Sequence, residues 1–209
     1  MLNAGVLTFK EFALREPLPL ATIHDAVLDF LRGRDDVVVE DALAVNAYVG
    51  ESRMTQDVDL LSTRATELAE ELRTHLNDRF HIAVRVREIG AGRGHRLYQT
   101  QQTGNRHWVD VRPVAQLPPA QRIERVLVVA PAELIAYKVI SYHQRRGQPK
   151  SGTDWRDLAM LLLTFPELKR ESGIVRERLQ AADADEAVMN VWKELVAQEI
   201  SATDEDAEF

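Results

Sequence analysis

The sequence predicts an α+β protein in which a mixed β-sheet comes first and helices come last. Three observations favour this fold class: short apolar runs alternate with helical spacing up to residue 78, a two-residue period follows over residues 80–114, and helical spacing returns from Pro131 onward. We therefore expect an α/β core over residues 1–130, with helices flanking the sheet, and a C-terminal helical region over residues 131–209 that closes one side of a cleft.

The first half of the chain alternates helices and strands. The expected elements are a helix over about residues 20–32, a short buried strand over 36–40, a helix over 41–49, a strand over 57–62, and a helix from 62 or 63 to about 78. Asp41 is placed to act as the N-cap of the second helix, and Ser62 or Thr63 as that of the third.

The middle of the chain reads as a β-meander, and the end as a series of helices. Alternating apolar residues and glycine-rich turns predict strands over residues 80–90, 95–101, 107–114 and 125–130. Helical spacing then predicts helices over residues 131–147, 154–164, near 166–182 and about 184–200. No internal repeat or low-complexity segment interrupts this order.

Composition excludes several classes of protein. The chain has 209 residues, of which 45% are hydrophobic and 28% charged, as is usual for a globular protein. It contains no run of roughly 18 apolar residues and no basic-then-apolar signal at its start, so we expect a cytoplasmic protein without a membrane partner. Because there is no cysteine, disulfides, thiolate nucleophiles and cysteine zinc sites are excluded.

Positive charge gathers in the middle of an otherwise acidic chain. The formal net charge is −7, yet nine arginines and only three acidic residues lie between Arg79 and Arg125, a local balance of +6. Such a segment is compatible with a polyanion such as RNA. The alternative is a solvated hairpin with arginines on its outer face.

Three aspartates stand out in apolar strands. Asp57 and Asp59 alternate with Val58 in "DVDLL", so in an extended strand both carboxylates face the same way, roughly 7 Å apart. Asp110 lies between valines in "WVDVR", and a suitable register would bring it beside the other two. Converging carboxylates without an alternating lysine favour Mg²⁺ or Mn²⁺, whereas each acid alone is more often a solvated strand residue.

Charged residues also interrupt two of the expected C-terminal helices. Lys138 lies on an otherwise apolar or small helical stripe in "AELIAYKVISYH", so its amine either reaches water or meets an anion. Asp154 and Asp157 are three residues apart at a helix start, where acids commonly complement the helix dipole.

In this order, the motifs resemble the AbiEii-like and MenT-type nucleotidyltransferase toxins of the DNA polymerase β-like nucleotidyltransferase superfamily. The resemblance covers about residues 36–165 and rests on "LAVNAY", "GESRMTQ", "DVDLL", "WVDVR", "PAELIAYKVISY" and "RRGQPKSGTDWRDLAMLL". It implies that Asp57, Asp59 and Asp110 bind the catalytic metal ions and that Lys138 contacts nucleotide phosphates. It further implies that Asp154 or Asp157 completes the pocket, and that the turn residues Ser52, Arg53 and Thr55 bind nucleotide.

The resemblance implies an activity and its partners. A nucleoside monophosphate would pass from an NTP to an acceptor hydroxyl, with Mg²⁺ or Mn²⁺ as cofactor. An RNA or tRNA end is the implied acceptor, with small molecules such as aminoglycosides still open, and a cognate antitoxin is an implied partner. The alternative is a degenerate member that binds nucleotide or a protein without turnover.

One position departs from the family pattern. Ahead of "LAVNAY" such proteins usually carry Gly-Gly or Gly-Ser, whereas this chain has Asp41-Ala42. A carboxylate at Asp41 would compete with a nucleotide phosphate for backbone amides. If this protein lacks the activity of the family, Asp41 is the residue that we expect to be responsible.

Overall fold

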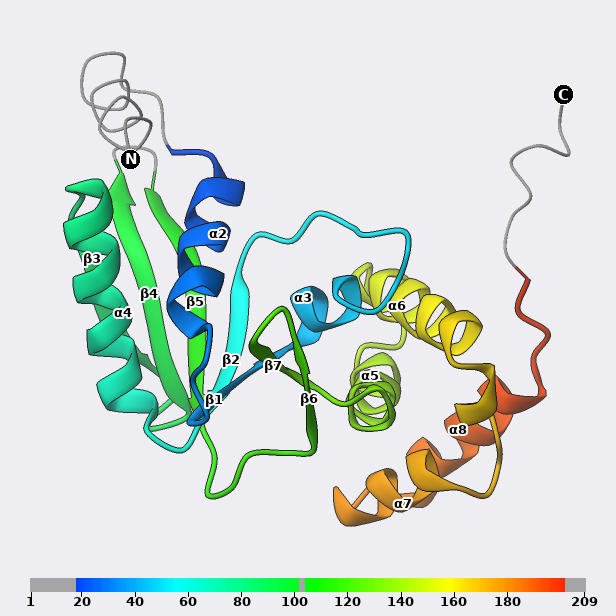
Figure 1. Ribbon diagram of the computed structural model, residues 1–209. Helices are drawn as coiled ribbons and strands as arrows, with labels where there is room; N and C mark the ends of the chain where they lie inside the picture. The colour runs from blue at the N-terminus through cyan, green and yellow to red at the C-terminus, as the bar shows by residue number, and fades with distance from the viewer. Residues whose placement is uncertain (1–17, 102–103, 202–209) are drawn as a thin grey trace, which may run out of the picture. The chain divides into compact units, whose positions relative to one another are not determined.

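The computed structural model describes residues 18–101 and 104–201, and the described chain divides into two compact units (Figure 1). The first unit contains the described residues up to Leu43 together with Met54–Val128, and the second contains Ala44–Arg53 together with the described residues from Val129 onward. The chain therefore leaves the first unit after Leu43, returns to it at Met54, and leaves it again after Val128.

The first unit is built on a seven-stranded sheet in the order β3-β4-β5-β2-β1-β7-β6. Its strands are β1 (Val37–Glu40), β2 (Val58–Ser62), β3 (Val84–Ile89), β4 (Gly94–Gln101), β5 (Gly104–Pro113), β6 (Ala120–Ile123) and β7 (Val126–Val129). β2 runs parallel to β5, and β1 runs parallel to β7, while β1–β2, β3–β4 and β4–β5 are antiparallel. The predicted mixed sheet is thereby confirmed.

Two helices cover one face of this sheet: α2 (Leu20–Leu31) and α4 (Ala65–Phe80), which lie against β3, β4 and β5 in Figure 1. Alternate strand residues such as Val58, Leu60 and Val109 join apolar residues of both helices in one buried cluster. This burial provides the main stabilisation of the first unit. The intervening strand residues therefore point to the opposite face, and the charged side chains of the site lie there.

The second unit is helical. Its elements are α5 (Pro131–Gln144), α6 (Lys150–Thr164), the 3₁₀ turn η1 (Pro166–Leu168), α7 (Ile174–Ala181) and α8 (Glu186–Ala197), and α3 (Asp41–Asn46) leads into it from the first unit. Asp185 caps α8 by accepting a hydrogen bond of 2.9 Å from the amide of Val188. Every helix in the described ranges is too short or too polar to cross a lipid bilayer.

Local differences from the sequence predictions have identifiable causes. The Ser62 hydroxyl donates to the carbonyl of Asp36 and accepts from the amide of Arg64, so α4 begins at Ala65 without a side-chain cap. The predicted strand before Pro131 is preceded by β6, which the sequence pattern did not indicate. The two strands meet at Glu124 and Arg125, which both have positive φ (47° and 71°) although neither is a glycine.

Candidate functional site

A row of charged residues crosses five adjacent strands of the first unit. Glu40 on β1 is the register partner of Asp59 on β2, which is the partner of Asp110 on β5. Asp110 is in turn opposite Arg96 on β4, which is opposite Arg87 on β3. The row, called here the charged row, thus consists of Glu40, Asp59, Asp110, Arg96 and Arg87, with carboxylates at one end and guanidinium groups at the other. Register partners on neighbouring strands face the same way, so these side chains share one face of the sheet.

The Asp59 end of the charged row carries an excess of negative charge. Asp59 is buried, and its carboxylate accepts a hydrogen bond of 3.0 Å from Arg112, which also donates to Glu40 at 2.9 Å. Burial, together with the charge of the nearby Asp41, raises the pKa of Asp59 to about 7 against the opposing effect of Arg112. The Arg112 guanidinium therefore binds both carboxylates at once.

The Asp110 carboxylate is held by Arg96 from the next strand. Arg96 donates from Nε to Oδ1 at 2.6 Å and from Nη2 to Oδ2, so the pair is bidentate. Asp110 is buried, and Arg96 is half-buried. The hydrogen bonds to Asp110 raise the pKa of the Arg96 guanidinium above its ordinary value. Arg96 and Asp110 therefore form an ion pair in the charged row.

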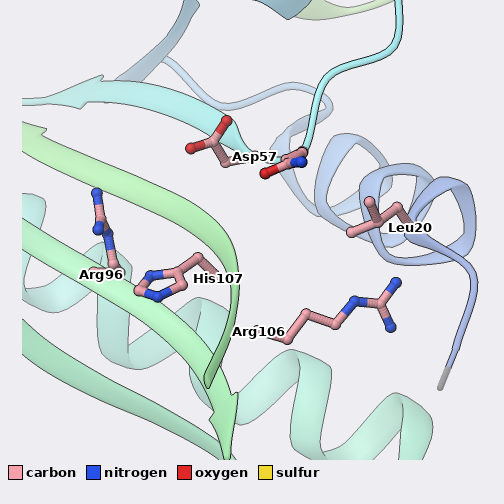
Figure 2. Close-up of a pocket in the computed structure, with 6 residues that line it drawn as sticks. Leu20, Asp57, Arg96, Arg106 and His107 are labelled. Atoms are coloured by element: carbon pink, nitrogen blue, oxygen red, sulfur yellow. The ribbon is translucent and has the colours of Figure 1, made fainter. Parts of the chain in front are cut away.

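Asp57 lies just before β2 and faces a cavity of about 480 Å³. Figure 2 shows Asp57 across from Arg96 and His107, with Arg106 and Leu20 further along the wall. The cavity thus combines one carboxylate with two arginines and a histidine. Its arginines are suited to bind a phosphate group, and its carboxylate is suited to bind a cation that accompanies the phosphate.

A second cavity, of about 650 Å³, lies on the other side of the Arg96–Asp110 pair. Three arginines and one acid line it, namely Arg93, Arg96, Arg112 and Asp110, together with the apolar residues Leu61, Ile89 and Pro113. β4 approaches β5 so closely here that a Cβ atom on Gly94 would lie 2.6 Å from the carbonyl oxygen of Val111. Arg96 is common to both cavities.

Asp41 has a left-handed backbone, with φ of 55°. It is the first residue of α3 and lies close enough to Asp59 to raise the pKa of that carboxyl. Few residues other than glycine adopt this conformation without strain, although aspartate tolerates it better than most. A glycine at this position would adopt the same φ without steric strain.

The acids of the charged row have the donor chemistry of a site for a hard divalent cation. Mg²⁺ and Mn²⁺ prefer carboxylate oxygens, and an excess of buried negative charge beside Asp59 is the environment that such an ion offsets. As the side chains stand, no group of three or more histidine, cysteine, aspartate or glutamate residues in the described ranges is arranged to hold a metal ion. The carboxylates of Asp59 and Asp110 therefore have the right chemistry to bind such a cation, which would replace their contacts with Arg112 and Arg96.

The second unit contains a separate buried cluster around Asp157 on α6. Its carboxylate accepts from Arg53 at 2.7 and 2.9 Å and from the Lys138 amine on α5 at 2.7 Å. Burial alone would raise the pKa of Asp157, but the hydrogen bonds from Arg53 and the charge of Lys138 outweigh it and lower the pKa. Asp157 is therefore held in its ionised form.

Lys138 meets an anion and does not extend into water. Its side chain is 4% exposed, and its amine lies 3.9 Å from Asp154 in addition to its bond with Asp157. Arg145 donates to both oxygens of Asp154, at 3.0 and 2.9 Å. Both aspartates are buried ion-pair partners within this unit, and not solvated acids in a first helical turn.

The turn ahead of β2 is anchored by Asn46. Its side-chain amide donates to the carbonyl of Arg53 at 2.8 Å and its oxygen accepts from the amide of Arg53 at 3.0 Å. This clasp fixes the backbone from which the Arg53 guanidinium reaches Asp157. Ser52 is exposed, and the Thr55 hydroxyl donates to the carbonyl of Asp57 at 3.1 Å.

Several residues of these clusters were not predicted from the sequence. Arg112 is two residues after Asp110 and therefore on the same strand face, a signal that alternation alone could have revealed. To predict that Arg96 and Glu40 belong to the site, one needs the strand order and register, which the sequence pattern left open. Asn46 and Arg145 carry no local signal of their partners.

Comparison with known proteins points to one family. A model of the family described as the nucleotidyl transferase AbiEii toxin, of a type IV toxin–antitoxin system, matches residues 42–208. No curated protein sequence matches the chain significantly.

Solved structures share the fold at low sequence identity. A Megavirus polyadenylate synthase aligns with a TM-score of 0.59 and 13% identity, over 79% of this chain and 35% of that one, so the chain spans about a third of its length. JHP933 from Helicobacter pylori aligns with a TM-score of 0.51 and 12% identity, over 84% and 87% of the two chains. The antibiotic-resistance factor ANT(2″)-Ia aligns with a TM-score of 0.50 and 14% identity, over 84% and 95%. These similarities establish a nucleotidyltransferase-like fold.

Proposed function

Because the chain belongs to the AbiEii nucleotidyltransferase toxin family, we propose that it transfers a nucleoside monophosphate from an NTP to an acceptor hydroxyl. The observation that carries this proposal is the charged row, which sets buried carboxylates beside guanidinium groups on one face of a nucleotidyltransferase-like sheet. Carboxylates that bind cations, next to cations that bind phosphate, are the two features that nucleotide transfer requires.

In this proposal, Asp57, Asp59 and Asp110 are the residues that would hold Mg²⁺ or Mn²⁺. A bound divalent ion supplies Lewis acidity at the phosphate oxygens and charge neutralisation in the transition state. Asp59 and Asp110 contribute through their burial, because a charge in a dry site interacts more strongly than one in water.

The bond changes are those of an in-line displacement. The acceptor hydroxyl oxygen forms a bond to the α-phosphorus, the bond from that phosphorus to the bridging oxygen of the β-phosphate breaks, and pyrophosphate leaves. The hydroxyl proton passes to a carboxylate oxygen of Asp110. Orientation of the hydroxyl and the phosphate by these residues contributes to the acceleration.

The cluster of the second unit is assigned to nucleotide binding. Lys138 contacts phosphate oxygens of the NTP, and Asp157 holds its amine in place together with Arg53. Asp154, which lies 3.9 Å from the same amine, completes the set. Ser52 and Thr55 of the turn are further proposed nucleotide-binding residues, as is Asp41, which lies near Asp59.

RNA is the proposed acceptor. The face that carries the charged row also presents Arg85, Arg87 and Tyr98, and the ring of Tyr98 lies 5.4 Å from the Arg87 guanidinium and 6.3 Å from the His107 ring. Arginines interleaved with aromatic rings bind single-stranded nucleic acid through phosphate contacts and base stacking. We place the action in the cytoplasm, where NTPs and RNA occur together, with a cognate antitoxin as partner.

The test is transfer from labelled NTPs. The protein is incubated with each α-³²P-labelled NTP, Mg²⁺ and total RNA, and label that moves into RNA is measured on a gel. Asp59→Asn is expected to remove the transfer, whereas Arg73→Gln, on an exposed part of α4, is expected to keep it. Label in an added aminoglycoside in place of RNA would overturn the acceptor assignment, and no labelled product with any NTP would overturn the activity.

One observation favours a second candidate function. Arg96 holds Asp110 by two hydrogen bonds. In a protein without turnover this ion pair would stay intact, and the protein would bind nucleotide or a partner protein without transferring a nucleotide. Nucleotide binding without incorporation, measured by calorimetry on the same preparation, would select this alternative.

A further inference from the structure

We propose that Arg96 is a phosphate-binding residue of the substrate site, which exchanges its bond to Asp110 for a bond to a substrate phosphate and thereby frees Asp110. The inference rests on the proposed function, because it names how substrate completes the same site. It is called the Arg96 exchange below.

The first support is the geometry of the pair. A guanidinium group binds carboxylate and phosphate with the same two parallel hydrogen bonds, so a phosphate can take the place of Asp110 without loss of donors. The Arg96 side chain is 29% exposed, whereas that of Asp110 is 6% exposed. A substrate therefore reaches the arginine first.

The second support is the space beside Arg96. It lines both the 480 Å³ cavity and the 650 Å³ cavity, so its guanidinium has a place to turn to on either side of Asp110. Each cavity already contains further cationic groups, Arg106 in the first and Arg93 with Arg112 in the second. An anion drawn to either cavity therefore meets Arg96 among other positive charges.

The third support is what the exchange leaves behind. Asp110 is the register partner of Asp59, and both are buried. Once Arg96 has turned away, two neighbouring carboxylates share a dry face without the guanidinium that offset one of them, and their affinity for a divalent cation rises. Phosphate binding and cation binding are then linked, and by reciprocity each strengthens the other.

The first experiment measures Mn²⁺ binding by calorimetry in the absence of nucleotide. Arg96→Gln is expected to bind Mn²⁺ about tenfold more tightly than the wild type, a coupling of ordinary size. Arg87→Gln, the matched control, removes the same charge one strand further along the charged row and is expected to change the affinity less than about threefold. Adding Asp110→Asn to Arg96→Gln is expected to cancel the gain.

The second experiment observes the exchange directly. The Nε–Hε signal of Arg96, assigned by its loss in Arg96→Gln, is followed by NMR in chelator-treated protein during titration with a 12-nucleotide single-stranded RNA or with ATP. A shift with RNA alone assigns the phosphate to the acceptor strand, and a shift with ATP alone assigns it to the nucleotide. Either shift supports the exchange.

Two results would overturn the Arg96 exchange: an Arg96 signal that stays unchanged at saturation with both ligands, or equal Mn²⁺ affinities for Arg96→Gln and Arg87→Gln. The outcome is independent of the transfer assay. An exchange without incorporation of label would leave this inference standing and overturn the proposed function, whereas incorporation with a static Arg96 would do the reverse.

Discussion

Asp59 in the first unit and Asp157 in the second are both buried aspartates, but their carboxylates meet opposite surroundings. Asp59 shares a single guanidinium, that of Arg112, with Glu40, and burial raises its pKa to about 7. Asp157 accepts hydrogen bonds from both Arg53 and Lys138, and these outweigh burial and lower its pKa. The two residues are alike in type and burial and differ in the charges around them.

The difference separates a stabilising acid from one that is suited to bind a ligand. An ionised carboxylate surrounded by cations contributes to folding, whereas a carboxylate among other carboxylates is costly until a cation or a proton arrives. Proteins accept such cost mainly at functional sites. This contrast supports the proposal that the charged row carries the chemistry and that Asp157 holds Lys138 in place.

The largest expected effect is the loss of Asp157. Asp157→Asn removes the anion that Arg53 and Lys138 share and leaves the buried Lys138 amine with a weaker acceptor, so unfolding free energy should fall by about 3 kcal/mol or more. Urea unfolding followed by circular dichroism measures it. A loss below about 1 kcal/mol would remove the distinction between the two aspartates.

The same ion pairs should make the free energy of unfolding fall at acidic pH. Because the pKa of Asp157 is lowered on folding, its contribution is present above the unfolded value of about 3.9 and is lost as the pH falls through the folded pKa. The stability difference between the wild type and Asp157→Asn should therefore shrink below about pH 4. Urea unfolding at a series of pH values checks this, and a difference that stays constant down to pH 2 would contradict it.

A gain of stability is expected at Asp59. Asp59→Asn removes charge from a buried acid that neighbouring carboxylates disfavour, while Arg112 keeps its bond to Glu40. In chelator the variant should be more stable than the wild type at pH 8 by about 1 to 2 kcal/mol. Mg²⁺ should stabilise the wild type and not the variant. Destabilisation on the scale of Asp157→Asn would show that Asp59 is a structural acid.

The smallest expected effect concerns Asp41. Glycine adopts a φ of 55° without steric strain, so Asp41→Gly should raise stability by about 0.5 to 1 kcal/mol in spite of the greater freedom of the unfolded chain. Ala42→Gly serves as the control and should destabilise the protein. If the Asp41 carboxylate also opposes the triphosphate, calorimetry should show tighter Mg-NTP binding by the Gly variant; equal binding would restrict Asp41 to a backbone role.

The periodicity of the sequence was sufficient for the fold class, whereas the family followed from the resemblance of its motifs to known proteins. Alternation predicts β2 and β5, and the motifs around Asp57 and Asp110 resemble those of the nucleotidyltransferase toxins, a resemblance that the family match confirms. Helical spacing likewise placed α2 over nearly the observed residues. Strong local patterns of this kind are set by burial, which the sequence records directly.

Pairing between distant residues was not predictable in the same way. Arg96 reaches Asp110 only because β4 and β5 pair in one register, and Arg53 reaches Asp157 across 104 positions of the chain. The left-handed residues Glu124 and Arg125 concealed the β6–β7 hairpin, since the usual glycine or asparagine is absent. Ion pairs and strained turns leave no periodic signal.

The Asn46 clasp on Arg53 has a consequence for how this protein can be cut. Residues 44–53 interrupt the first unit in the chain yet belong to the second. A fragment that ends at residue 130 would keep the clasp but lose Asp157, and the complementary fragment would keep Asp157 and Lys138 without the guanidinium of Arg53. The two units are thus joined by three covalent crossings, and no single proteolytic cut yields either of them whole.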